Sequence, residues 1–91
     1  MADINKTQFF NFVAEPELSV KTVLGHVYTA MEEKGYNPVS QIVGYIMSGD
    51  PTYITNHKGA RSMIMKVERD DLVEELLREY IKNESWKEQQ D

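Results

Sequence analysis

Apolar positions repeat with the period of an α-helix over most of the chain after residue 19. The first stripe has the spacing i, i+3, i+4, i+7, i+8, i+11 and consists of Val20, Val23, Leu24, Val27, Tyr28 and Met31. Ser19 precedes it as a candidate N-cap, and Gly35 follows as a C-terminal stop. The pattern predicts a helix over about 20–34, with His26 on its polar face as a solvated side chain.

A second stripe follows after one proline and ends at another. It consists of Val39, Ile42, Val43, Ile46 and Met47. Asn37-Pro38 supplies a cap with proline at the first helical position, so a helix is predicted over about 38–48. Asp50-Pro51 repeats this device and predicts a single turn near 51–54. Gly44 lies inside the second helix, and we interpret it as permitting close approach by another helix.

Two further stripes complete the pattern. The third helix is predicted to start near Lys58, with Ala60, Met63, Ile64 and Val67 on its apolar side. The phase then changes, and a fourth helix over about 70–83 is predicted from Leu72, Val73, Leu76, Leu77, Tyr80 and Ile81. The fold class is therefore all-α, a compact bundle of about four to five short helices, with residues 17–83 as its helical domain.

The two ends of the chain lack this periodicity. Phe9, Phe10 and Phe12 have no helical spacing, and Pro16 follows them. Residues 1–16 are therefore predicted to form a flexible N-terminal arm with a short extended or docked stretch at 9–13. Residues 84–91 are predicted to form a polar tail that contains Trp86.

Size and composition limit the class of protein. A chain of 91 residues builds one small core, and a second subunit would add buried area, so a homodimer is expected. The chain has no Cys, no signal-peptide pattern and no apolar run that would span or enter a membrane, so it is expected to be cytoplasmic. Its net charge of −5 argues against binding nucleic acid.

The charge is unevenly distributed. Between residues 56 and 69, four basic side chains oppose one acidic side chain, and His57 lies beside them; the basic residues are Lys58, Arg61, Lys66 and Arg69. Such a segment either binds an acidic or phosphorylated protein partner or is simply a solvated helix face. We take His57, Lys58, Arg61 and Arg69 as the candidate partner-binding residues.

No pattern of catalytic residues accompanies these features. The chain has no G-x-S-x-G, no H-E-x-x-H and no glycine-rich phosphate loop, and neither His has an evident triad partner. The sequence therefore predicts no enzyme, no metal site and no cofactor. A helix-turn-helix nucleic-acid-binding protein remains the alternative, since short helices could build one.

Several motifs resemble the IreB family of regulatory phosphoproteins of Gram-positive bacteria. They are Glu33-Lys34-Gly35-Tyr36-Asn37-Pro38, Gln41-Ile42-Val43-Gly44-Tyr45, Ser48-Gly49-Asp50-Pro51, Tyr53-Ile54, Glu68-Arg69-Asp70 and Val73-Glu74-Glu75-Leu76 with Tyr80. The resemblance covers about residues 7–82. It implies a helical homodimer that a membrane Ser/Thr kinase with PASTA repeats phosphorylates and a cognate phosphatase dephosphorylates.

The resemblance also implies a role and a modified residue. The role is control of peptidoglycan synthesis and cell-wall antibiotic tolerance, through protein partners in Clp-dependent turnover of the first committed enzyme. The implied phosphoacceptor is Thr7; a second acceptor of some family members would fall at Ile4. The chain departs from the family's basic residues at Asn56 and Met65, which weakens the basic surface.

Overall fold

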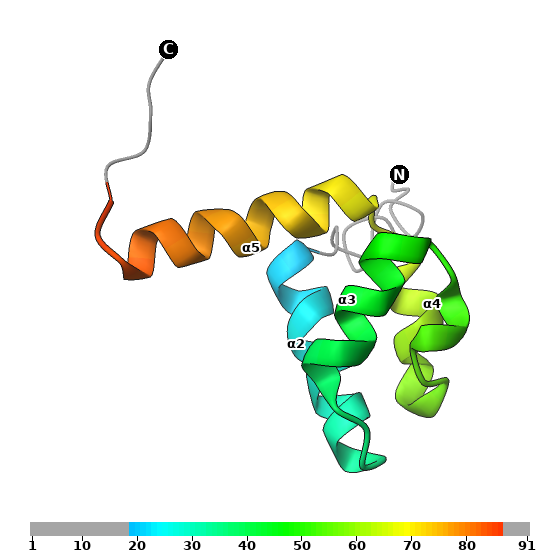
Figure 1. Ribbon diagram of the computed structural model, residues 1–91. Coiled ribbons are helices and arrows are strands. Elements are labelled where there is room, and N and C mark those ends of the chain that lie inside the picture. The colour runs from blue at the N-terminus through cyan, green and yellow to red at the C-terminus, as the bar shows by residue number, and fades with distance from the viewer. Residues whose placement is uncertain (1–18, 87–91) are drawn as a thin grey trace, which may run out of the picture.

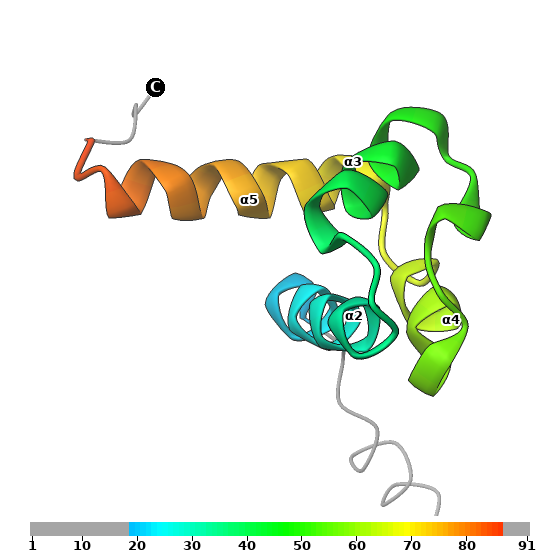
Figure 2. The ribbon, with the colours of Figure 1, turned by 60° about the horizontal axis from the view of Figure 1, so that its bottom comes forward.

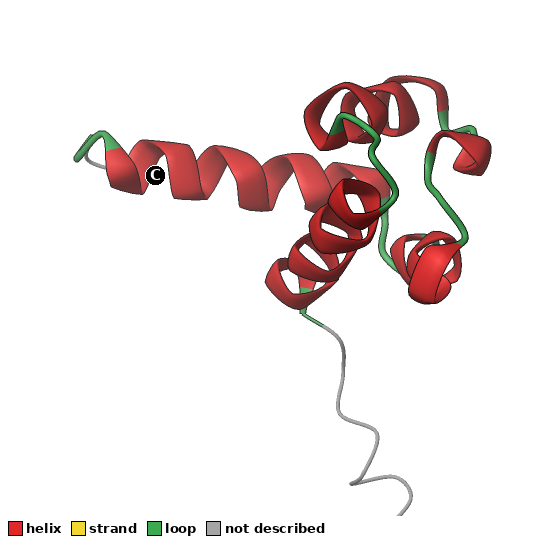
Figure 3. Ribbon diagram, turned by 90° about the horizontal axis from the view of Figure 1, so that it is seen from below, coloured by secondary structure: helices red, strands yellow, loops and turns green. Residues whose placement is uncertain are grey.

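Short helices make up most of residues 19–86, which are the residues that the computed structural model describes (Figure 1). In chain order they are α2 (Val20–Glu33), α3 (Pro38–Ser48), the 3-10 turns η1 (Pro51–Tyr53) and η2 (His57–Gly59), α4 (Ala60–Ile64) and α5 (Arg69–Asn83). No strand occurs within this range (Figure 3). The all-α prediction is confirmed, whereas the predicted arm over 1–16 lies outside the described residues.

Local capping sets the ends of α2 and α3, as predicted. The side chain of Ser19 accepts a hydrogen bond from the backbone N–H of Thr22 at 3.1 Å, and Asn37 does the same for Ser40 at 3.0 Å. At the end of α2, Gly35 adopts a φ of 81°. The Tyr36 N–H then reaches the Met31 carbonyl at 3.0 Å, which is the Schellman arrangement.

A tight corner follows α3. Gly49 takes a left-handed φ of 77°, and Asp50 caps η1 by accepting from the Thr52 N–H at 3.0 Å and from the Thr52 hydroxyl at 2.7 Å. These bonds from Thr52 hold the pKa of the Asp50 carboxyl below its ordinary value. The Ser48 hydroxyl donates to the Gly44 carbonyl at 2.7 Å and accepts from the Asp50 N–H at 3.0 Å. The predicted cap-and-proline turn is thus confirmed.

The third helix begins later than the sequence predicts. Lys58 and Gly59 adopt φ values of 54° and 70°, which an α-helix cannot contain, so α4 starts at Ala60 instead of near Lys58. It also ends early, at Ile64. α5 runs from Arg69 to Asn83, close to the predicted 70–83.

The core lies between α2 and the helices packed around it. Figure 2 looks almost along α2, with α3 and α4 beside it and α5 extending away from the group. Within residues 19–86 nine residues are buried: Val23, Val27, Ala30, Met31, Tyr45, Ile54, Ala60, Ile64 and Leu72. Four of the nine belong to α2, which makes it the central element.

The stripes of α3 and α5 are less buried than those of α2. Tyr45 is the only buried residue of α3, and Leu72 is the only one of α5. The C-terminal half of α5 extends beyond the other helices (Figure 1). None of the helices within residues 19–86 is both long and apolar enough to cross a membrane.

Gly44 does admit a close neighbour, but the neighbour is not an α-helix. A Cβ at this position would overlap ring carbons of Tyr53 from η1. The Tyr53 carbonyl in turn accepts from the side-chain amide of Gln41 at 3.0 Å, so η1 is fastened along α3. Gly25 also lies inside a helix, but a Cβ added there would meet no atom of the described residues within 4 Å.

These two glycines give a matched test of packing. Gly44→Ala should destabilise the fold by about 1–2 kcal/mol, because the added methyl group must displace the Tyr53 ring. Gly25→Ala should stabilise it by up to about 1 kcal/mol, because alanine favours the helix and meets no neighbour. Urea unfolding of both variants measures the difference, and equal effects would show that the Tyr53 ring does not pack on Gly44.

Candidate functional site

The start of the basic segment is tied to α2 by a carboxylate. Nε2 of His57 donates to Glu33 Oε1 at 2.9 Å, and the Lys58 ammonium lies 3.2 Å from the same oxygen. The hydrogen bond from His57, followed by that from Lys58, holds the pKa of the Glu33 carboxyl below its ordinary value. Glu33 therefore offsets part of the positive charge that the sequence places at 57–58.

The His26 side chain, from α2, binds the backbone of the same segment at Lys58. Its Nε2 lies 2.7 Å from the Lys58 carbonyl oxygen. A carbonyl only accepts, so this nitrogen carries the proton and donates. His26 is therefore not simply solvated, in contrast to the prediction, because its ring binds the backbone of Lys58, whose φ is 54°.

Arg61 is bound inside the fold. Its Nε donates to the Ile54 carbonyl at 2.8 Å, and Ile54 is completely buried. The bond satisfies a carbonyl in the irregular segment between η1 and η2, where no helix supplies a donor. The positive charge of Arg61 also lies near Asp50 and contributes to the lowered pKa of that carboxyl, after the bonds from Thr52.

Arg69 closes the corner after α3. One terminal nitrogen of its guanidinium donates to the Ile46 carbonyl at 2.8 Å, which is one of the last four carbonyls of α3. The guanidinium lies directly over Gly49, where a Cβ would approach its central carbon to 2.9 Å. Gly49 is therefore needed both for its positive φ and for the space beneath Arg69.

The four candidate partner-binding residues thus fall into two groups. His57 and Lys58 meet at Glu33, whereas Arg61 and Arg69 bind backbone carbonyls elsewhere. Each guanidinium has N–H groups beyond the one used here, so partner binding by these residues stays a prediction. The arrangement does not favour a nucleic-acid interface, because its charge is partly neutralised. Thr7 lies outside the described residues.

An uncharged surface is the more prominent feature. α3 has no charged residue along its length, and Val39, Val43 and Met47 on its outer side are 68%, 50% and 78% exposed. Beside them is a hollow of about 240 Å³, which we call the apolar groove; it is lined by Leu24, Tyr28, Pro38, Val39, Ile42, Val43, Ile46 and Leu76. The groove lies between α2, α3 and α5.

A second apolar surface runs along α5. Val73, Leu77 and Tyr80, which we call the α5 stripe, are 44%, 54% and 54% exposed. Surface helices normally bury such a stripe against a neighbour. Neither surface was predicted from the sequence, although the absence of charge along α3 was a visible signal.

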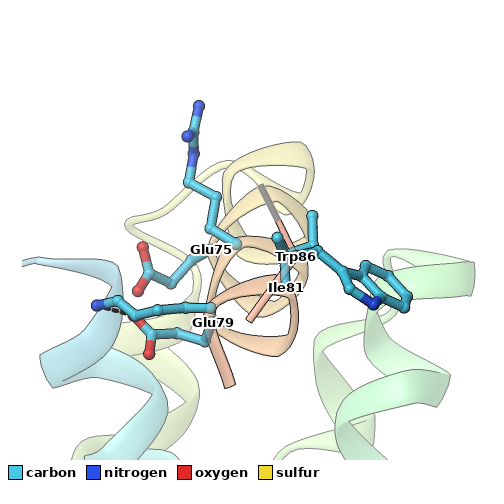
Figure 4. A pocket seen from close by; sticks show the side chains of 6 residues that line it. Glu75, Glu79, Ile81 and Trp86 are labelled. Atoms are coloured by element: carbon cyan, nitrogen blue, oxygen red, sulfur yellow. Dashed lines mark ion pairs between the residues drawn. The ribbon is translucent and has the colours of Figure 1, made fainter. Parts of the chain in front are cut away.

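Another hollow, of about 270 Å³, lies along the C-terminal half of α5 (Figure 4). Trp86 packs edge-on against Tyr80 with ring centroids 5.8 Å apart, and Glu79 pairs with Lys21 at 3.1 Å. This pairing holds the pKa of the Glu79 carboxyl below its ordinary value. Apart from Trp86, which follows α5 closely, every residue lining this hollow belongs to α5, so no second element encloses a ligand there.

Comparison with known proteins gives consistent matches over most of the chain. The family described as IreB regulatory phosphoprotein matches residues 5–82. A UPF0297 protein of Lachnoclostridium phytofermentans is 65% identical over 83 residues, which are 91% of this chain and 94% of that protein. UPF0297 proteins of Ruminiclostridium cellulolyticum and Acetivibrio thermocellus are 54% and 60% identical, over 88% and 85% of this chain and 91% and 86% of theirs.

The bound state of Arg61 gives a stability prediction. Arg61→Ala should destabilise the fold by about 1–3 kcal/mol, because it leaves the Ile54 carbonyl without its donor. The control is Lys66→Ala, whose exposed side chain makes no hydrogen bond or ion pair with the described residues and should change stability by less than about 0.5 kcal/mol. Urea unfolding that gives equal midpoints for both variants would contradict a structural role for Arg61.

Proposed function

Because the chain belongs to the IreB family of regulatory phosphoproteins, we propose that it is a non-catalytic phosphoprotein that acts downstream of a PASTA-type Ser/Thr kinase. In this proposal Thr7 is the phosphoacceptor, and a cognate phosphatase removes the phosphate. The output is control of peptidoglycan synthesis and antibiotic tolerance, through protein partners that govern Clp-dependent turnover of the first committed enzyme. The protein acts in the cytoplasm.

The observation that carries the proposal is the family match over residues 5–82, which includes Thr7. Phosphorylation of this residue would add nearly two negative charges and three strong acceptor oxygens. The hydroxyls of Thr52 and Thr55, by contrast, are already bonded within the fold, to Asp50 and to the His57 N–H. Because these two hydroxyls are already bonded within the fold, we do not take Thr52 or Thr55 as the phosphorylated residue.

The exposed apolar surfaces support a protein-binding role. A regulator without catalytic groups acts by contact, and contact between proteins is strongest where apolar side chains are removed from water. We propose that the α5 stripe pairs with a second copy of the chain to form a homodimer. The support is that α5 extends beyond the other helices and leaves Val73, Leu77 and Tyr80 exposed (Figure 1).

Phosphorylation by the native kinase tests whether Thr7 is the phosphoacceptor. Incubation of the protein with the kinase and ATP, followed by mass-spectrometric mapping, should place one phosphate on Thr7. Thr7→Ala should abolish the modification and Thr7→Ser should retain it, because serine keeps the hydroxyl. Phosphate found on Thr52 or Thr55 in place of Thr7 would refute the assignment.

Analytical ultracentrifugation tests whether the protein forms a homodimer through the α5 stripe. At micromolar concentration the protein should sediment at twice its chain mass of 10.5 kDa. Leu77→Asp should give the single-chain mass, because it places a charge in the apolar α5 interface. Met65→Asp is the control, since Met65 is similarly exposed at 55% but lies off α5, and it should stay dimeric. A single-chain mass for the unsubstituted protein would rule out the dimer.

A further inference from the structure

The apolar groove is a site that the proposed dimer leaves open. The dimer uses the α5 stripe, whereas the groove is formed by α2 and α3 with Leu76 at its edge. Its eight lining residues are all apolar or aromatic, and none of them is charged. A hollow of about 240 Å³ with such a lining favours a compact apolar ligand over water or an ion.

The size of the groove limits the choice of occupant. Eight residues line it, whereas a stable dimer interface takes about 20–30 residues a side. A cavity of about 150 Å³ already holds one benzene ring, so the groove has room for one phenyl ring and part of a second. It is therefore sized for a few side chains from a short segment.

The chain contains one segment of matching chemistry. All three of its phenylalanines lie at positions 9, 10 and 12, and residues 19–86 contain none. In an extended conformation, Phe10 and Phe12 would point to the same side, because alternate residues share a face. Two rings on one side of a narrow segment fit a groove lined only by apolar and aromatic side chains.

The connection to α2 brings this segment within reach. Leu24 and Tyr28 in the groove belong to α2, and Tyr28 lies about 12 Å along the helix axis from Val20. The seven Cα–Cα steps from Phe12 to Ser19 span up to about 23 Å when the chain is extended. A tether of this length gives the segment a high effective concentration at its own groove, well above that of a segment on another molecule.

We propose that residues 9–13 bind in the apolar groove of their own chain, with Phe10 and Phe12 against Leu24, Tyr28 and Val43. The groove is then an intramolecular docking site for the N-terminal segment. The aromatic residues at 9, 10 and 12 thereby cover part of the apolar surface that residues 19–86 leave exposed.

If residues 9–13 bind in the groove, phosphorylation of Thr7 can change how tightly they bind. One carboxylate adjoins the groove: Glu32 accepts from the Tyr28 hydroxyl at 3.3 Å. A phosphate two residues before Phe9 would be repelled by this carboxylate, so phosphorylation should weaken docking. This consequence rests on the proposed function, whereas docking itself does not.

A spin label tests docking in the unmodified, full-length protein. Because the chain has no Cys, Asn11→Cys accepts a single nitroxide on the side of the segment opposite Phe10 and Phe12. Amide NMR signals of Leu24, Tyr28 and Val43 should broaden strongly, while those of Ser62 and Lys66 on and after α4 should not. Phe10→Ser with Phe12→Ser in the labelled chain should abolish the broadening, and these positions lie outside the described helices.

Two further samples complete the test. Val43→Gln, at a half-exposed groove position, should reduce the broadening at Leu24, whereas Met65→Gln, exposed but outside the groove, should not. Absence of broadening at the groove in the unsubstituted labelled chain would overturn the proposal. Equal broadening in a mixture of nitroxide-labelled and isotope-labelled chains would also overturn it, because the bound segment would then come from another copy. Neither result would bear on whether Thr7 is phosphorylated.

Discussion

The guanidinium of Arg69 over Gly49 is the contact on which the arrangement of α3, η1 and α5 depends. It binds a carbonyl in the last turn of α3 from the first residue of α5, so it joins two helices whose starts are 31 positions apart in the sequence. Gly49 permits this because it has no side chain and adopts a positive φ. The side of α3 that carries Val39, Val43 and Met47 is left exposed.

This arrangement leaves many large apolar side chains exposed to water. Nine buried residues form the core of the described chain, while twelve large hydrophobic residues stay substantially exposed. The apolar groove and the α5 stripe account for most of them. Surfaces of this kind suit a regulatory protein that acts by contact, and two separate surfaces allow the proposed dimer contact and the proposed docking contact to coexist.

The helices could be predicted from sequence because their signals are local. Ser19, Asn37 and Asp50 act as caps within three residues of themselves, and Gly35 and Gly49 end helices through their own backbone conformations. The environments of His26, Arg61 and Arg69 could not be predicted in this way, because their acceptors lie 32, 7 and 23 positions away. Burial also escaped prediction: periodicity places the stripe of α3 on one side of a helix, but it does not say whether another element covers that side.

In our proposal, phosphorylation of Thr7 changes what the apolar groove contacts, without refolding the helices. The most direct measurement compares amide NMR spectra of the unmodified and the Thr7-phosphorylated protein. We expect shifts around the groove, at Leu24, Tyr28, Val43 and Leu76, with the signals of α4 unchanged. Shifts confined to residues 1–18, or spread through α2 and α4 alike, would contradict it.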